Sequence, residues 1–246
     1  MVNFKLESWA AIAPELKSEE DWHTWLQHPR TIDGPLDKVS LKQFPPMLRR
    51  RFSTLGKCAM GAALPLLEEG EVIPSIFASR HGDTELTLSL LENMGLDEPM
   101  SPTGFSLAVH NAVSGLFTIA RKDTSEVTSI AATQGLVVQT LLEAVGQLQV
   151  SERVLCVIYD VPLPDLYRRY SESTPFPYAI AMILNRSVGE SYSLAQRDEV
   201  GDSVESTLSA AQDSESFQFV RLLTGLSSEA QSALNGMNWR IARAEV

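Results

Sequence analysis

The stretch SIAATQGLVV, residues 129–138, decides the fold because two patterns of different period meet in it. The run at 127–132 is rich in β-branched and small residues, which predicts a strand. After Gly135, apolar residues recur on one side at helical spacing, at Val137, Leu141, Ala144, Val145 and Leu148. Gln134 stands at the junction, where many enzymes carry a nucleophile. The sequence therefore predicts a strand–turn–helix elbow that presents a carboxamide.

Working outward from the elbow, helical and strand-like patterns alternate along the chain. Helices are expected at 18–27, 47–70, 83–95, from about 107, and in the tail, and buried strands at 72–80, 153–161, 177–187 and near Trp239. This order predicts an α/β fold, with a mostly buried mixed sheet covered by helices. Residues 198–216 are polar, serine-rich and acidic, which predicts an exposed loop. Because there is no internal repeat or linker, residues 1–246 are expected to form one domain.

Composition limits the class of protein. The chain has 246 residues, of which 44% are hydrophobic, so it can bury a sizeable core. No apolar run approaches the ~18 residues of a membrane span, and Lys5 and Glu7 interrupt the N-terminal run, so no secretory signal is expected. Cys58 and Cys156 have no metal-type spacing and are expected to be buried thiols. A cytoplasmic protein without metal or cofactor is the expectation.

The net charge of −11 argues against nucleic acid, anionic membranes and acidic proteins as general partners. One basic cluster opposes this trend, formed by Lys42, Arg49, Arg50, Arg51 and Lys57. It could bind a phosphate or an acidic carrier, but a solvated helix face is the favoured interpretation.

Motifs for known chemistry are missing around the elbow. The sequence contains no GxSxG, no GxxxxGK[ST], no GxGxxG and no HExxH, and all four histidines precede residue 111. The RHGD stretch at 80–83 offers an arginine and a histidine for phosphate chemistry, but it also reads as the end of a strand. Gln134 cannot form a thiolate, although it can fill the same space and hydrogen-bond in both directions. A surface helix cap is the alternative role for Gln134.

The elbow resembles that of the β-ketoacyl synthases. SIAATQ is similar to their SIATAC motif, in which the last Cys accepts the acyl group, and Gln134 falls on that Cys. Upstream, Ser101, Pro102, Asn111 and Gly115 lie at the spacings of the family pattern. The stretches LRRRFSTLGKCAMGAALPLLEEG and PSIFASRHGDTE resemble the family's early helix and first core strand, so the resemblance covers about 44–185.

The departures from the family are equally informative. Complete synthases have a second half with two catalytic histidines, so the resemblance implies a single thiolase-like half here. Cys-to-Gln replacement is typical of chain length factors, which are inactive partners of a competent synthase. The resemblance thus implies a non-catalytic subunit that pairs with a β-ketoacyl-carrier synthase, reaches the acyl carrier protein only indirectly, and resembles the short proteins of aryl-polyene pathways.

The resemblance also implies where partner and tunnel would be contacted. The strand at 127–132, including Val127, Thr128, Ser129 and Ile130, would lie at the interface. The loop at 103–109 would reach the tunnel, with Phe105, Leu107 and Val109 followed by His110 and Asn111. Ordinary core packing is the alternative for Phe105 and Leu107.

Two enzymatic alternatives remain. A malonyl-carrier decarboxylase would exploit Gln134 as a mimic of an acylated Cys, but it would need the family's histidines. A stand-alone hydrolase or acyl-transfer enzyme would have to use His81 or His110 with Asp83.

Overall fold

The computed structural model describes residues 1–171, 173–197 and 214–244. Their strands are β1 (Val2–Ile12), β2 (Ser75–Ser79), β3 (Val127–Ala131), β4 (Arg153–Asp160), β5 (Tyr178–Asn185), β6 (Glu190–Arg197), β7 (Glu229–Leu234) and β8 (Met237–Arg243). Their helices are α1 (Glu19–Gln27), α2 (Pro46–Arg49), α3 (Thr54–Ala63), the 3₁₀ turn η1 (Leu64–Leu66), α4 (Thr84–Gly95), α5 (Pro102–Leu107), α6 (Ala112–Arg121), α7 (Leu136–Gln147), α8 (Asp165–Arg168) and α9 (Glu215–Leu223).

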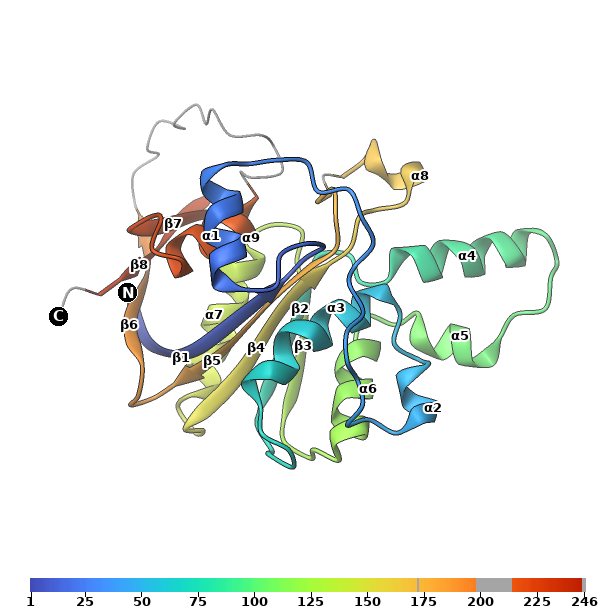
Figure 1. Cartoon of the computed structure of the whole chain (residues 1–246), viewed down its shortest axis with the longest axis horizontal. Helices are drawn as coiled ribbons and strands as arrows, with labels where there is room; N and C mark the ends of the chain where they lie inside the picture. The colour runs from blue at the N-terminus through green and yellow to red at the C-terminus, as the bar shows by residue number, and fades with distance from the viewer. Residues whose placement is uncertain (172, 198–213, 245–246) are drawn as a thin grey trace.

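The described strands form one mixed sheet in the order β3-β2-β4-β5-β1-β6-β8-β7 (Figure 1). β2 runs parallel to β3 and β4, and the other neighbouring pairs are antiparallel. The parallel part contains the elbow, because β3 leads into α7. The predicted α/β class with a mixed sheet is therefore confirmed.

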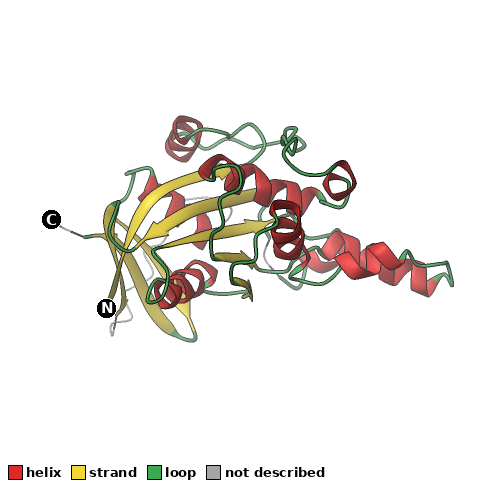
Figure 2. Ribbon diagram, turned by 90° about the horizontal axis from the view of Figure 1, so that it is seen from below, coloured by secondary structure: helices red, strands yellow, loops and turns green. Residues whose placement is uncertain are grey.

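The central strands are apolar throughout because both faces of the sheet are covered. Every residue of β5 is buried, and β4 is buried from its second residue onward. Alternate side chains enter opposite cores: Cys156 and Met182 face one layer, whereas Val157 and Ala181 face the other. Figures 1 and 2 show the sheet between these helical layers.

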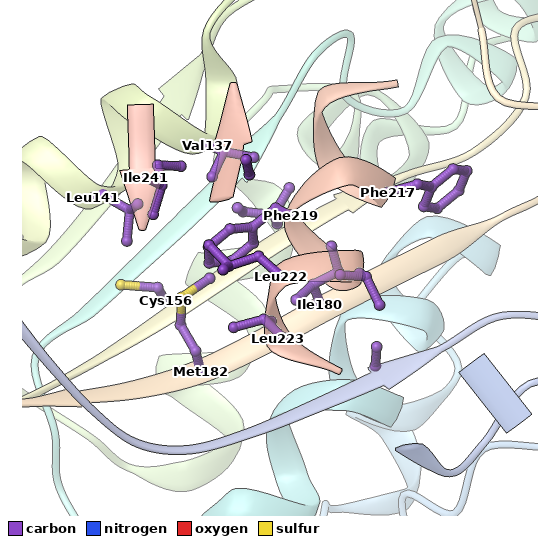
Figure 3. Close-up of a cluster of buried hydrophobic side chains, with 14 of the residues drawn as sticks. Val137, Leu141, Cys156, Ile180, Met182, Phe217, Phe219, Leu222, Leu223 and Ile241 are labelled. Carbon is purple, nitrogen blue, oxygen red and sulfur yellow. The ribbon is translucent and has the colours of Figure 1, made fainter. Parts of the chain in front are cut away.

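The first core lies under α1, α7 and α9. Figure 3 shows Val137 and Leu141 of α7 meeting Phe219 and Leu222 of α9 near Cys156 on the sheet. The rings of Trp22, Trp25 and Phe217 extend this core through edge and tilted contacts. The second core, under α3 and α6, is built around aromatic and aliphatic side chains such as Met60, Phe77 and Phe117.

Helices α4 and α5 form an arm that extends away from the sheet (Figures 1 and 2). Ser101 caps α5 by accepting a hydrogen bond from the Gly104 N–H. Most of the predicted loop at 103–109 is therefore helical, and that prediction was wrong over 103–107. The polar side chain of Ser101 and Pro102 at the first helical position explain the start of α5.

Two further sequence predictions differ from the structure. The helix expected at 47–70 is broken into α2, α3 and η1. Ser53 caps the start of α3 by accepting a hydrogen bond from the Gly56 N–H, and Pro65 ends α3. The pattern search also missed β1, β6 and β7, although Asn235 and Gly236 carry the positive φ angles of a tight hairpin between β7 and β8. The expected loop at 198–216 lies outside the described residues except for 214–216, of which 215 and 216 begin α9.

Candidate functional site

The elbow has the predicted strand–turn–helix form, and Gly135 makes it possible. β3 ends at Ala131, α7 begins at Leu136, and Gly135 between them has φ +64°. A Cβ atom at this position would lie 2.8 Å from the Cβ of Leu234 on β7. Both the left-handed backbone and the close approach of β7 therefore require glycine here.

Gln134 opens onto a pocket of about 380 Å³. Most of its lining residues carry a hydroxyl, amide or charged group, and the full lining consists of Arg80, Thr133, Gln134, Gly135, Leu136, Ser173, Thr174, Tyr178, Ser214, Glu215, Ser216, Ser232 and Ala233. The elbow, the residue after β2, the start of β5, the start of α9 and the end of β7 together form its walls.

A half-buried carboxylate, that of Glu215, lies at the N-terminus of α7. Oε1 of Glu215 accepts hydrogen bonds from the backbone N–H of Val137 at 2.9 Å and of Val138 at 3.3 Å. The hydroxyl of Ser232 donates a third bond at 2.8 Å. Burial raises the pKa of Glu215, and these donors oppose that rise by stabilising the ionised form. Glu215 thus satisfies backbone donors that no helical carbonyl can reach.

A second acid, Asp160, is buried behind the pocket wall. Oδ1 of Asp160 accepts bonds from the Ser79 hydroxyl at 2.9 Å and the Arg80 N–H at 3.0 Å. The hydroxyl of Tyr178 lies 3.4 Å from its other oxygen and 2.8 Å from the Ser216 hydroxyl. Burial raises the pKa of Asp160 to about 6, although the Ser79 hydroxyl pulls in the opposite direction. A group that titrates near neutrality is therefore linked to the pocket through Tyr178.

The histidines considered as bases lie elsewhere. Nε2–H of His110 donates to the carbonyl oxygen of Ser79 at 3.1 Å, and Nε2 of His81 lies 3.2 Å from the Ser171 hydroxyl. Neither ring is among the described residues that line the Gln134 pocket. Asp83 caps α4 by accepting from the Leu86 N–H, so the RHGD stretch forms a turn at the start of a helix.

The residues expected at the tunnel lie at and beyond the base of the arm, away from Gln134. Phe105 and Val109 are 63% and 53% exposed. Leu107 is half-buried and packs against the second core, and Asn111 is exposed at the start of α6. The structure therefore separates the arm residues from the elbow pocket within this chain.

The residues expected at the interface lie together on an edge strand. β3 pairs with β2 on one side only among the described strands. Val127 is 38% exposed, and Ile130 packs against the first core. The hydroxyl of Thr128 donates to Glu143, whereas that of Ser129 lies 2.8 Å from the Ser114 hydroxyl on α6.

Other sequence expectations concern metal, membrane and charge. Cys58 and Cys156 are buried free thiols, and burial raises the pKa of each. In the described ranges, no cluster of His, Cys, Asp and Glu could hold a metal ion, and no helix is long and apolar enough to span a membrane. In the basic cluster, Arg49 supports its own turn by donating from Nε to the Phe44 carbonyl.

Reasoning from sequence missed Glu215, Ser232, Tyr178 and Asp160. The pair Ser214–Glu215 before an apolar run is a helix-start signal that pattern reading could have used. Nothing local, however, indicates that Glu215 reaches α7, because the two segments are 77 residues or more apart in sequence.

The single mixed sheet, its elbow and the helical layers on both faces define a thiolase-like half-domain. A model of the family "Beta-ketoacyl synthase, N-terminal domain" matches residues 22–240, a wider span than the motifs indicated. The chain belongs to this family. A search of curated proteins gives no match.

Three solved structures have folds similar to that of this chain. A chain in the complex of the ketosynthase ApeO with its chain length factor ApeC, from Xenorhabdus doucetiae, is 28% identical, with a TM-score of 0.81 over 99% of this chain and 100% of that one. A chain of the ishigamide ketosynthase/chain length factor is 10% identical, with a TM-score of 0.65 over 82% of this chain and 69% of that one. A chain of the type II polyketide complex AntDE:AntF, of an acyl-carrier protein with its ketosynthase, is 14% identical. Its TM-score is 0.55 over 75% of this chain and 63% of that one.

Proposed function

We propose that this chain is a non-catalytic, chain-length-factor-like subunit that pairs with a β-ketoacyl-carrier-protein synthase and shapes its acyl tunnel. The observation that carries the proposal is end-to-end similarity to a chain from a complex of a ketosynthase with its chain length factor. Gln134 at the elbow, where the family's motif has a nucleophilic Cys, supports the non-catalytic part. We also propose an aryl-polyene or related polyketide pathway, in the cytoplasm, as the setting of this subunit.

The edge of β3 is the first part of the proposed interface. Its sequence, VTSIA, contains no charge or proline that would blunt an exposed edge. Unpaired backbone groups on such an edge can accept a strand from another chain. An antiparallel strand of the synthase would complete the sheet and bring the partner's active site beside the elbow.

The arm is the second part of the proposed interface. Its helix α4 buries only Leu90, and exposed apolar side chains occur along the arm and at its base, at Leu91, Met94, Leu96, Met100, Phe105 and Val109. Soluble proteins rarely expose so many apolar side chains together unless a partner covers them. α6 packs on α5 and on β3, so it links the two parts of the interface.

Phe105 and Val109 would then form walls of the partner's tunnel, with Leu107 behind them. Product length would be limited by the volume that these side chains leave open, since one methylene is worth about 1–3 kcal/mol in such a pocket. Recruitment of the acidic acyl carrier would fall to the synthase, because a chain of net charge −11 repels it at low salt.

Co-expression with a β-ketoacyl-carrier-protein synthase from the same organism tests the pairing. We expect a stable one-to-one complex by light scattering, and aggregation of this chain when it is expressed alone. A soluble chain that does not bind the synthase would contradict the proposal.

Substitutions on the arm test the interface itself. Phe105→Ala and Val109→Glu should each weaken the complex by ten- to thirtyfold or more, since truncating a buried aromatic anchor costs about 2 kcal/mol. Val150→Glu is the matched control, because Val150 is 83% exposed and lies after α7, away from the arm. Equal affinity of the arm variants and the control would exclude the arm from the interface.

The decarboxylase alternative has less support. Its chemistry would require histidines beside Gln134, and none of the described lining residues is a histidine. An assay for decarboxylation of malonyl carrier by the purified chain separates the two functions, because the proposed subunit should show none.

A further inference from the structure

Glu215 places a carboxylate at the start of α7, close in sequence to Gln134, the position that matches the nucleophile of the β-ketoacyl synthase motif. Its carboxylate accepts two hydrogen bonds from the first turn of α7, three and four residues after Gln134. Glu215 and Gln134 also line the same pocket. The carboxylate comes from α9, an element distant in sequence, so its position is a product of the tertiary fold.

The N-terminus of a helix carries a partial positive charge that favours a nearby anion. This charge lowers the pKa of a thiol at such a position, and free backbone N–H groups there can stabilise an oxyanion. A carboxylate already bound to the same N–H groups removes both effects. It also opposes a second anion by direct repulsion, since the pocket is partly shielded from water.

We propose that Glu215 is a built-in anion that neutralises the N-terminus of α7, so that this elbow would not activate a nucleophile even with cysteine in place of Gln134. Under the proposed non-catalytic function, two features would then prevent catalysis. One is glutamine in place of the nucleophilic cysteine, and the other is the negative charge of Glu215 beside it. The inference stands on the contacts of Glu215 and does not depend on pairing with a synthase.

The other charges around the pocket do not cancel Glu215. Arg80 is the one cation among the described lining residues, and it follows β2. Its charge lowers the pKa of the buried Asp160 carboxyl. Among the described lining residues, β5 contributes Tyr178 and β7 contributes Ser232, whose hydroxyl donates to Glu215. The balance near the elbow is therefore negative.

Glu215 also connects α9, α7 and β7, so its replacement could simply loosen the structure. The test therefore needs a readout that a structural role alone would not move. The acidity of a thiol introduced at residue 134 is such a readout. Cys58 and Cys156 do not interfere, because both are buried.

We would compare Gln134→Cys with the double variant Gln134→Cys/Glu215→Gln, in the full folded chain, by thiolate absorbance near 240 nm against pH. The amide keeps the shape of the side chain but removes its charge. We expect the thiolate fraction at pH 7 to rise roughly five- to tenfold in the double variant. Gln134→Cys/Glu98→Gln is the matched control, since Glu98 is exposed on the arm, and it should not differ from Gln134→Cys.

An unchanged thiolate fraction in the folded double variant would overturn the proposal. If the double variant does not fold, Gln134→Cys alone still decides the question, by comparison of its native thiol with its thiol in 6 M urea. The proposal predicts that the native thiol is no more acidic than the unfolded one. A native thiol that is markedly more acidic while Glu215 is present would refute it.

Discussion

Replacing Gly135 with alanine tests whether the elbow is held by backbone conformation, by contact with β7, or by both. Gly135 has φ +64°, and an added Cβ would lie 2.8 Å from Leu234 Cβ, 3.0 Å from its Cδ1 and 3.2 Å from its Cγ. Real Cβ atoms essentially never approach another atom within 3.0 Å, and Leu234 Cβ is fixed to the backbone of β7. Either β7 or the start of α7 would have to move.

Gly236 provides the matched control for the conformational part. It also has positive φ, at +74°, but no atom lies within 4 Å of its added Cβ. Gly236→Ala should therefore lose only about 1–2 kcal/mol of unfolding free energy, the cost of left-handed backbone for a residue with a side chain. Gly135→Ala should lose a further 1–3 kcal/mol for the overlap, or about 2–5 kcal/mol in total.

Urea unfolding followed by fluorescence of the buried Trp22 and Trp25 would measure both losses. Adding Leu234→Ala to Gly135→Ala should recover only part of the overlap term, because the closest atom, Cβ, remains. If Gly135→Ala and Gly236→Ala lose the same free energy, then contact with β7 does not constrain the elbow and the reasoning is refuted.

Two further predictions concern buried ionisable groups. Burial raises the pKa of Asp160 from 3.8 to about 6, so the folded state binds its proton more tightly, and stability falls as the pH rises through that window. Between pH 4 and pH 6 the unmodified chain should lose about 2 kcal/mol more stability than Asp160→Asn in urea titrations; parallel curves would contradict this. Cys58 and Cys156 should not react with a thiol reagent such as DTNB in the native chain and should react fully in urea, because both are buried and burial raises the pKa of each; fast native labelling would contradict their placement.

The candidate site could be predicted only in part. The elbow followed from the change of period around Gly135, and Gln134 followed from its place between the two patterns. The arm was misjudged because α5 is short and is started by Ser101 and Pro102, and so few residues provide no helical period to detect. The roles of the arm and β3 at an interface remain predictions that the proposed experiments would test.

The order of helical and strand-like patterns along the sequence determined the class of fold. Continuous apolar runs such as β4 and β5 can be buried only between two helical layers, and that requirement is legible from their composition. β1 was missed although it lies in the centre of the sheet, because its burial pattern is irregular and its pairing with β5 includes a register shift between Leu6 and Ser8.

The tertiary structure alone decided the electrostatics of the elbow. Sequence placed Gln134 at the start of a helix, but only the fold brings Glu215 from α9 onto Val137 and Val138 and sets Ser232 of β7 beside it. Such contacts follow from how helices and strands far apart in sequence pack together, and periodicity reports only which face of each element is buried. The sequence thus determined that Gln134 lies at the elbow, whereas the packing of α9 and β7 determined that the carboxylate of Glu215 lies near it.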